Sequence, residues 1–196
     1  YDLTPYLHEG VNALGIMLGN GWYNMHARAE WNFDTAPWRD EPKARMHVRL
    51  ELADGSVQTI VSDGAWEGST GPVRHDCIRN GEIYDARRER DGWDRAGYRG
   101  VAWGAAHVRA APAGELRAQM APPIRVVGSI RPVALWESSP GVWVYDLGQN
   151  IAGWAQITVL GEAGTEVTLR YGERLNDDRS LRQDEIAVFV YQGLFQ

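Results

Sequence analysis

The 196-residue sequence is short of the features that most functional classes require. It has one cysteine, Cys77, so the fold cannot depend on an intrachain disulfide. It has no apolar run near the roughly 20 residues that a membrane span needs, so no membrane partner is expected. Its 20 Lys and Arg are outnumbered by 26 Asp and Glu and form no polybasic block. Phosphates select a basic face, so nucleic acid is not expected as a partner either.

Motifs that mark nucleotide, zinc or hydrolase sites are also missing. The sequence contains no G-x-G-x-x-G, P-loop, H-E-x-x-H or G-x-S-x-G pattern. The five histidines show no metal-ligand spacing, so no zinc centre is predicted. Cys77 has His75 nearby, but a lone cysteine is most often a buried thiol, and we expect that here.

Long amphipathic helices are absent, and short alternating segments take their place. The clearest is residues 46–61, where two alternating runs flank Asp54-Gly55 and predict a β-hairpin. With 22 Gly and 9 Pro as punctuation, the pattern predicts an all-β fold of sandwich or jelly-roll type. A single helical turn capped by Thr4 is expected before them. Further strands are expected at residues 12–18, 124–127, 133–136, 142–147 and 186–190, with a second hairpin over 157–171.

A span with Pro and Gly but no periodicity, residues 111–123, predicts a linker. We therefore predict two β-sandwich (jelly-roll-like) domains, over residues 1–115 and 120–196. The first strand has nothing before it to pair with, and the last ends without a closing turn. A sheet that lacks strands has open edges, so we expect both domains to be truncated, the second at its C-terminus.

Aromatic rings, amides and carboxylates are mixed in residues 20–42, a long segment without a clean period. A tryptophan or tyrosine face packs against the C–H face of a sugar, while amides and carboxylates bind its hydroxyls. The alternatives are that these rings pack onto a neighbouring domain or belong to the core. The candidate carbohydrate-binding residues are Asn20, Trp22, Tyr23, Trp31, Trp38, Asp76, Asn80 and Glu82.

Acidic clusters raise two further candidate chemistries. Glycoside hydrolysis needs two carboxylates across the scissile bond, but sequence spacing gives no separation between carboxyl groups. The same acids equally suit surface ion pairs with neighbouring arginines, so no catalytic residue is predicted. Oxygen ligands for calcium are also gathered within ten residues, but they match no EF-hand spacing, and calcium stays a candidate without an assigned site. These ligands are Asp76, Asn80, Glu82 and Asp85.

Several segments resemble, in the same order, segments of bacterial α-L-rhamnosidases. The run LGNGWY at residues 18–23 is similar to a signature of the N-terminal β-domain of that family, and DLGQNIAGW at 146–154 is similar to a motif of the domain that follows. Other matching segments are TPYL at 4–7, GVNALG at 10–15, APWR at 36–39, the Asp54-Gly55 turn, GEIYDAR at 81–87, Gly161 to Gly164 and RYGE at 170–173.

The resemblance implies a non-catalytic accessory region of an enzyme that releases terminal α-L-rhamnose from glycosides and polysaccharides with inversion. It places the general acid and base on a helical barrel C-terminal to this segment, so that catalytic domain is the expected partner within the same chain. A rhamnose-containing glycan or glycoside is the expected ligand, and some relatives bind rhamnose with calcium in the N-terminal β-domain. The alternatives are a free-standing carbohydrate-binding module and a purely structural β-sandwich linker.

Overall fold

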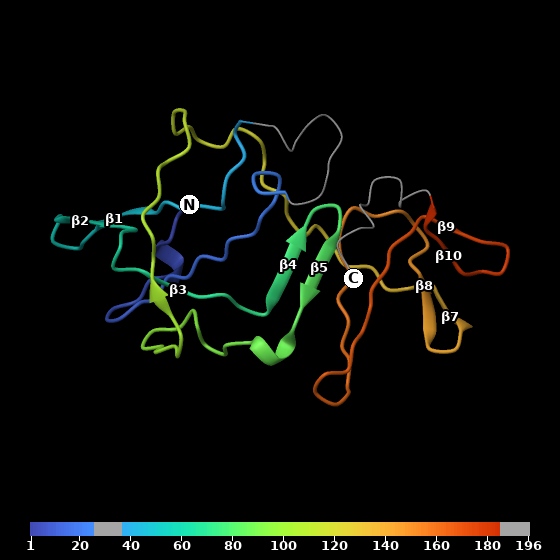
Figure 1. The fold of residues 1–196 in the computed structure, drawn as a ribbon. Coiled ribbons are helices and arrows are strands. Elements are labelled where there is room, and N and C mark those ends of the chain that lie inside the picture. The colour runs from blue at the N-terminus through green and yellow to red at the C-terminus, as the bar shows by residue number, and fades with distance from the viewer. Residues whose placement is uncertain (26–36, 185–196) are drawn as a thin grey trace. The chain divides into compact units, whose positions relative to one another are not determined.

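The computed structural model describes residues 1–25 and 37–184, and the predicted all-β class is confirmed. The described elements are β-strands joined in antiparallel pairs and two short 3-10 helices (Figure 1). The chain divides into two compact units, Tyr1–Ala113 and Gly114–Gln196. Within the described residues, no helix has the length and apolarity that crossing a membrane requires.

The predicted hairpin at residues 46–61 forms in the first unit. Strand β1 (His47–Glu51) pairs with β2 (Val57–Val61), and His47 lies opposite Val61. In the turn, the Gly55 N–H donates to the Leu52 carbonyl over 2.9 Å, and Gly55 has φ +81°, a conformation that favours glycine. The Asp-Gly turn therefore fixes the register that the alternating pattern requires.

The first unit contains another hairpin, at residues 73–84, which the sequence pattern did not predict. Strand β4 (Val73–Cys77) pairs with β5 (Gly81–Tyr84), and the 3-10 helix η3 (Ala86–Arg88) follows directly (Figure 1). The sequence of β4 alternates poorly, because charged residues separate Val73 from Cys77, so its pattern gives no clear strand signal. Cys77 is buried, as expected for a lone thiol.

A short non-local pair closes the end of the first unit. Strand β3 (Glu67–Gly68) pairs with β6 (Gly104–Ala105), which brings together the two ends of residues 69–103. Within that excursion the rings of Trp93 and Trp103 stack with centroids 6.4 Å apart. A Cβ on Gly15 would lie 2.4 Å from the Trp93 ring, so the backbone of residues 12–18 passes directly against this aromatic group.

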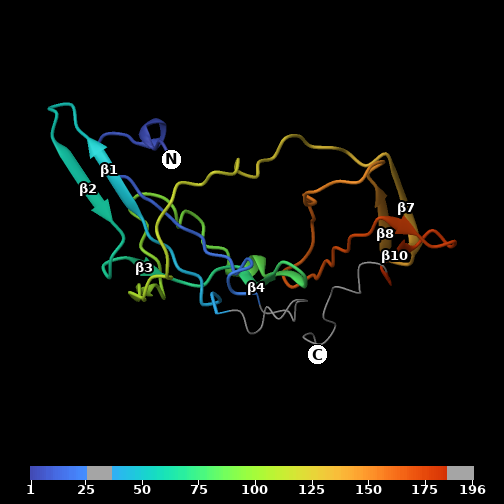
Figure 2. The ribbon, with the colours of Figure 1, turned by 90° about the horizontal axis from the view of Figure 1, so that it is seen from above.

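The second unit contains two hairpins that a tryptophan connects. Strand β7 (Ala134–Ser139) pairs with β8 (Val142–Asp146), and β9 (Arg174–Leu175) pairs with β10 (Leu181–Arg182) (Figure 2). The indole N–H of Trp136 donates to the Arg179 carbonyl over 3.0 Å. The Arg179 guanidinium lies 4.4 Å from the Trp136 ring centroid, a cation–π contact.

Several sequence expectations differ from the structure. No strand forms at residues 12–18, 124–127 or within 157–171, although the Glu162–Thr165 turn of the last segment is present. The helical turn is the 3-10 helix η1 (Thr4–Tyr6), and Leu3 rather than Thr4 is its N-cap. The Asp2 carboxylate accepts from the Thr4 N–H instead. Residues 186–190 lie outside the described residues.

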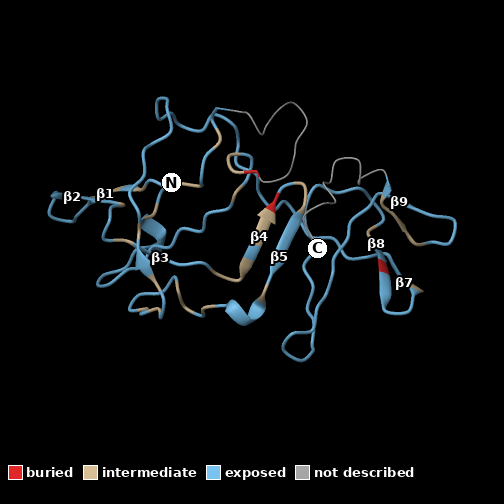
Figure 3. Cartoon of the chain, viewed as in Figure 1, coloured by how far each residue is buried: buried red, intermediate tan, exposed pale blue. Residues whose placement is uncertain are grey.

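Burial is concentrated in few places (Figure 3). Among the described residues, the buried apolar side chains are Met25, Cys77 and Val144. Two of them are neighbours of the predicted site residues, since Cys77 follows Asp76 on β4 and Met25 follows the 18–23 run. The segment around residue 20 and the hairpin β4–β5 therefore lie beside the buried side chains of the first unit.

Candidate functional site

Asn20 and Asp76, two of the predicted site residues, contact each other across 56 positions of sequence. The Asn20 backbone N–H donates to Asp76 Oδ2 over 2.7 Å. The Asn20 side-chain amide donates to Asp76 Oδ1 over 2.7 Å and to the Asp76 backbone carbonyl over 3.1 Å. All three bonds are partly buried. We call this contact the Asn20–Asp76 latch, and it attaches the 18–23 run to strand β4.

The acceptor groups of Asn20 are also occupied. The Asn24 side-chain amide donates to Asn20 Oδ1 over 2.7 Å, and the Asn24 backbone N–H donates to the Asn20 carbonyl over 3.0 Å. Gly21, between them, has φ +51° and allows the chain to turn back on itself. The amide of Asn20 is therefore used within the protein, and Asp76 is directly opposite Glu82 in the register of β4–β5. Like charges placed opposite each other are destabilising, so the donors from Asn20 offset that repulsion.

The predicted aromatic residues lie beside this latch in different ways. Trp22 is 46% exposed, and the Arg79 guanidinium lies 5.9 Å from its ring centroid. Trp38 is also 46% exposed. Tyr23 contributes its backbone carbonyl, which accepts from the Asp40 N–H over 3.2 Å. Trp31 lies outside the described residues.

Asn80 and Glu82 complete the predicted set. Asn80 lies in the turn between β4 and β5, and Glu82 is on β5 and exposed. Both side-chain amide atoms of Asn80 are buried, and neither has a hydrogen-bond partner in the described part of the chain. Buried amide groups nearly always have a partner, so Asn80 is unusual among the site residues.

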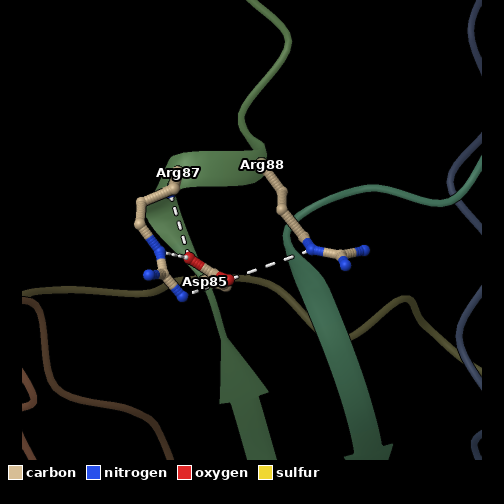
Figure 4. Close-up of polar contacts among 3 residues, drawn as sticks. All are labelled: Asp85, Arg87 and Arg88. Atoms are coloured by element: carbon tan, nitrogen blue, oxygen red, sulfur yellow. Dashed lines mark hydrogen bonds and ion pairs between the residues drawn. The ribbon is translucent and has the colours of Figure 1, made fainter. Parts of the chain in front are cut away.

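Asp85 forms the strongest ion pair at the end of this hairpin (Figure 4). Its carboxylate accepts from Arg87 Nε over 2.7 Å and Nη2 over 2.9 Å, and Oδ1 also accepts from the Arg87 backbone N–H over 3.2 Å. Arg88 Nε lies 3.9 Å from Oδ2. The hydrogen bonds from Arg87 lower the pKa of Asp85 to about 2. The Asp85 N–H donates to the Pro72 carbonyl over 2.8 Å, so the pair braces η3 against the hairpin.

The candidate calcium ligands do not fit a calcium ion. Asp76 accepts from Asn20, and Asp85 accepts from Arg87, so both carboxylates already bind donors within the chain. Across residues 1–25 and 37–184, no group of three or more His, Cys, Asp or Glu side chains is placed to hold a metal ion.

One contact near the site had no signal in the sequence. The Arg39 guanidinium donates to the carbonyl of Met25, which is fully buried. This bond attaches the segment that carries Trp38 to the residues that directly follow the 18–23 run. Arginine at such a position reads as a surface charge, so only the folded chain identifies it as a structural donor.

Comparison with known proteins identifies both halves of the chain. Residues 1–128 match the family model described as "Alpha-L-rhamnosidase N-terminal domain". Residues 136–192 match that described as "Bacterial alpha-L-rhamnosidase concanavalin-like domain". The two matches follow one another without overlap.

Curated relatives are consistent with those matches. An α-L-rhamnosidase of Formosa agariphila is 37% identical over 84% of this chain and 17% of the relative, and one of Streptomyces avermitilis is 35% identical over 92% and 17%. The chain thus spans about one-sixth of the length of these relatives.

A solved structure is also similar. The crystal structure of the Streptomyces avermitilis α-L-rhamnosidase complexed with L-rhamnose matches with a TM-score of 0.64 and 35% identity, over 70% of this chain and 13% of that one. The N-terminal family model alone covers residues 1–128 of the 196-residue sequence. The chain therefore belongs to the α-L-rhamnosidase N-terminal domain family, followed by residues of the concanavalin-like domain.

Proposed function

We propose that this chain is a non-catalytic β-rich region of an enzyme that hydrolyses terminal α-L-rhamnose from glycosides and polysaccharides. The observation that carries the proposal is the pair of consecutive family matches, over residues 1–128 and 136–192. The four relatives found in the curated set are all named α-L-rhamnosidase, and the chain aligns with 17–20% of their lengths. Its partner is the catalytic domain of the same polypeptide.

The geometry of the first unit favours a structural role for its polar side chains. The polar groups of Asn20 and Asp76 bind each other, and Asp85 binds Arg87, so these side chains fix the chain rather than present free groups to a substrate. A general acid or base has to reach the proton that it transfers. The carboxylates of this region instead act as acceptors that hold the 18–23 run, β4 and η3 together.

The test uses the full-length protein and an aryl α-L-rhamnoside. Wild type is expected to hydrolyse this substrate, and Glu82→Gln is expected to keep kcat within about tenfold of wild type. Removal of a general acid or base lowers kcat by about 10²–10⁴-fold, so a loss of that size in Glu82→Gln would overturn the non-catalytic role. Glu115→Gln, at an exposed ion pair with Arg117, is the matched control. Absence of rhamnoside hydrolysis by wild type would overturn the assigned reaction.

A second candidate function is carbohydrate binding by the first unit, and the exposure of Trp22 and Trp38 favours it. A half-exposed indole beside Arg79 offers an apolar face and polar groups to a rhamnose-containing glycan. Rhamnose is then expected to quench tryptophan fluorescence, and Trp22→Ala to abolish the quenching. Unchanged fluorescence at tens of millimolar rhamnose would leave the segment as a purely structural β-sandwich.

A further inference from the structure

The sequence contains two Asn-Gly pairs, Asn20-Gly21 and Asn80-Gly81, and the structure treats them very differently. An asparagine followed by glycine is chemically labile, because glycine has no side chain to hinder attack of its own nitrogen on the asparagine amide. Asparagine is accordingly counted among the thermolabile residues. Whether the reaction proceeds in a folded protein depends on how firmly the side chain is held.

Asn20 is held at each polar atom of its side chain. Its amide nitrogen donates to two oxygens of Asp76, and its amide oxygen accepts from Asn24. Its backbone N–H is bound as well, to Asp76 Oδ2. To bring the Asn20 Cγ to the Gly21 nitrogen, the side chain would have to leave its own bonds, and Asp76 Oδ1 would lose its side-chain donor.

Asn80 has none of these restraints within the described residues. Its amide oxygen and nitrogen are buried without a hydrogen-bond partner. It lies in the three-residue turn between β4 and β5, and Gly81 has φ +82° with nothing within 4 Å of the position that a Cβ would occupy. Rotation of the Asn80 side chain therefore breaks no hydrogen bond within the described residues, and no side chain or backbone atom fills the space beside the Gly81 Cα.

We propose that Asn80-Gly81 is a site of spontaneous deamidation and that the Asn20–Asp76 latch protects Asn20-Gly21 from the same reaction. The Gly81 nitrogen gives up its proton to solvent and attacks the Asn80 Cγ. A C–N bond forms, the bond from Cγ to the side-chain nitrogen breaks, and ammonia leaves. Water then adds to either carbonyl carbon of the cyclic imide and reopens it, which leaves aspartate or isoaspartate at position 80. No electron acceptor is needed.

The product changes the hairpin in a defined way. A carboxylate at position 80 joins Asp76 and Glu82, which already lie opposite each other in β4–β5. The isoaspartate product also adds an atom to the backbone of a three-residue turn. Both changes act on the hairpin that carries Asp76, so deamidation at position 80 is expected to loosen the latch.

The test measures both sites in one sample. The full-length protein is incubated at mildly alkaline pH, digested, and analysed by mass spectrometry for peptides in which an amide has become a carboxyl group. Deamidation at Asn80 is expected to be faster than at Asn20 by at least about fivefold, the factor that one net hydrogen bond makes in an equilibrium. Equal rates, or a faster reaction at Asn20, would overturn the proposal.

Two controls separate the structural effect from intrinsic chemistry. In denaturant both sites are followed by glycine and the two rates are expected to converge, so a difference that persists there would contradict protection by the fold. Asp76→Ala removes the two carboxylate acceptors of Asn20 and is expected to raise its rate toward that of Asn80. If Asp76→Ala fails to fold, the ratio of native to denatured rates in wild type still decides between the sites.

Discussion

At the scale of single residues, the polar side chains near the hairpin β4–β5 act mainly on one another. The Asn20–Asp76 latch and the Asp85–Arg87 pair each join a carboxylate to several donors. Hydrogen bonds to a charged group are stronger than those between neutral groups. The chain therefore uses its acids here for positioning, and two predictions test that use.

Asn20→Ala is expected to destabilise the full-length protein by about 1–3 kcal/mol, because it removes the side-chain donor of the partly buried Asp76 Oδ1 and leaves only the backbone N–H bond to Oδ2. Urea unfolding measures the change. Asn150→Ala, at an exposed asparagine, is the control and is expected to change stability by less than about 0.5 kcal/mol. Equal effects of the two substitutions would show that the latch contributes nothing.

The Asp85–Arg87 pair predicts a stability that falls with acid. The pKa of Asp85 is lowered from 3.8 to about 2 by its bonds to Arg87, so its ionised form is favoured in the folded protein. This contribution is fully present above the unfolded pKa and is lost as pH falls from about 4 to about 2. Over that range Asp85→Asn, compared with wild type by thermal unfolding, is expected to lose less stability. Parallel pH profiles would contradict the prediction.

At the scale of elements, sequence pattern worked where apolar alternation met a turn signal. The hairpin β1–β2 was predicted in this way, with Asp54-Gly55 as its turn, and the strands expected at residues 133–136 and 142–147 form as β7 and β8, although their pairing was not predicted. Strand β4 was not predicted because its charged residues obscure the alternation. The contact of Asp76 with Asn20 depends on the tertiary fold and has no local sequence signal. Residues 12–18 alternate correctly but pack against an aromatic group instead of a strand.

The site was predicted in part for the same reason. Composition singled out Asn20 as an amide among aromatic residues and Asp76 as an oxygen ligand, but nothing in the sequence indicates that residues 56 positions apart bind each other. The bond from Trp136 to Arg179 spans 43 positions and was likewise absent from the sequence analysis. Contacts of this kind depend on how the strands pair, which local patterns do not encode.

The contact between Gly15 and Trp93 gives a prediction for the packing of residues 12–18. A Cβ at position 15 would lie 2.4 Å from the ring, so Gly15→Ala is expected to force the indole aside and destabilise the protein by about 1–3 kcal/mol. Gly71→Ala is the matched control, since a Cβ there meets nothing within 4 Å. Chemical denaturation of both variants measures the difference, and similar stabilities would mean that the aromatic group does not pack on residues 12–18.

At the scale of the whole molecule, the amount of exposed apolar surface stands out. Large side chains such as Trp143, Tyr145 and Leu135 are each more than half exposed. Apolar surface on this scale favours association with other surfaces over a stable isolated state.

The 196 residues expressed alone are therefore expected to bind a hydrophobic dye strongly and to unfold without a sharp transition. Dye fluorescence per mole, compared with the full-length protein, measures the first effect, and differential scanning calorimetry measures the second. The full-length protein is expected to show weak dye binding and a cooperative transition. A sharp transition with no dye binding in the isolated segment would show that its apolar side chains bury one another.

The pair β3–β6 has a consequence for protein engineering. The pair holds the two ends of residues 69–103 together at only two positions, where Glu67 pairs with Ala105 and Gly68 with Gly104. Since the entropic cost of closing a loop grows only with the logarithm of its length, lengthening the segment between β3 and β6 adds little to that cost. An exposed glycine within that segment, such as Gly97, is accordingly a suitable place to graft a reporter peptide without rebuilding β3 and β6.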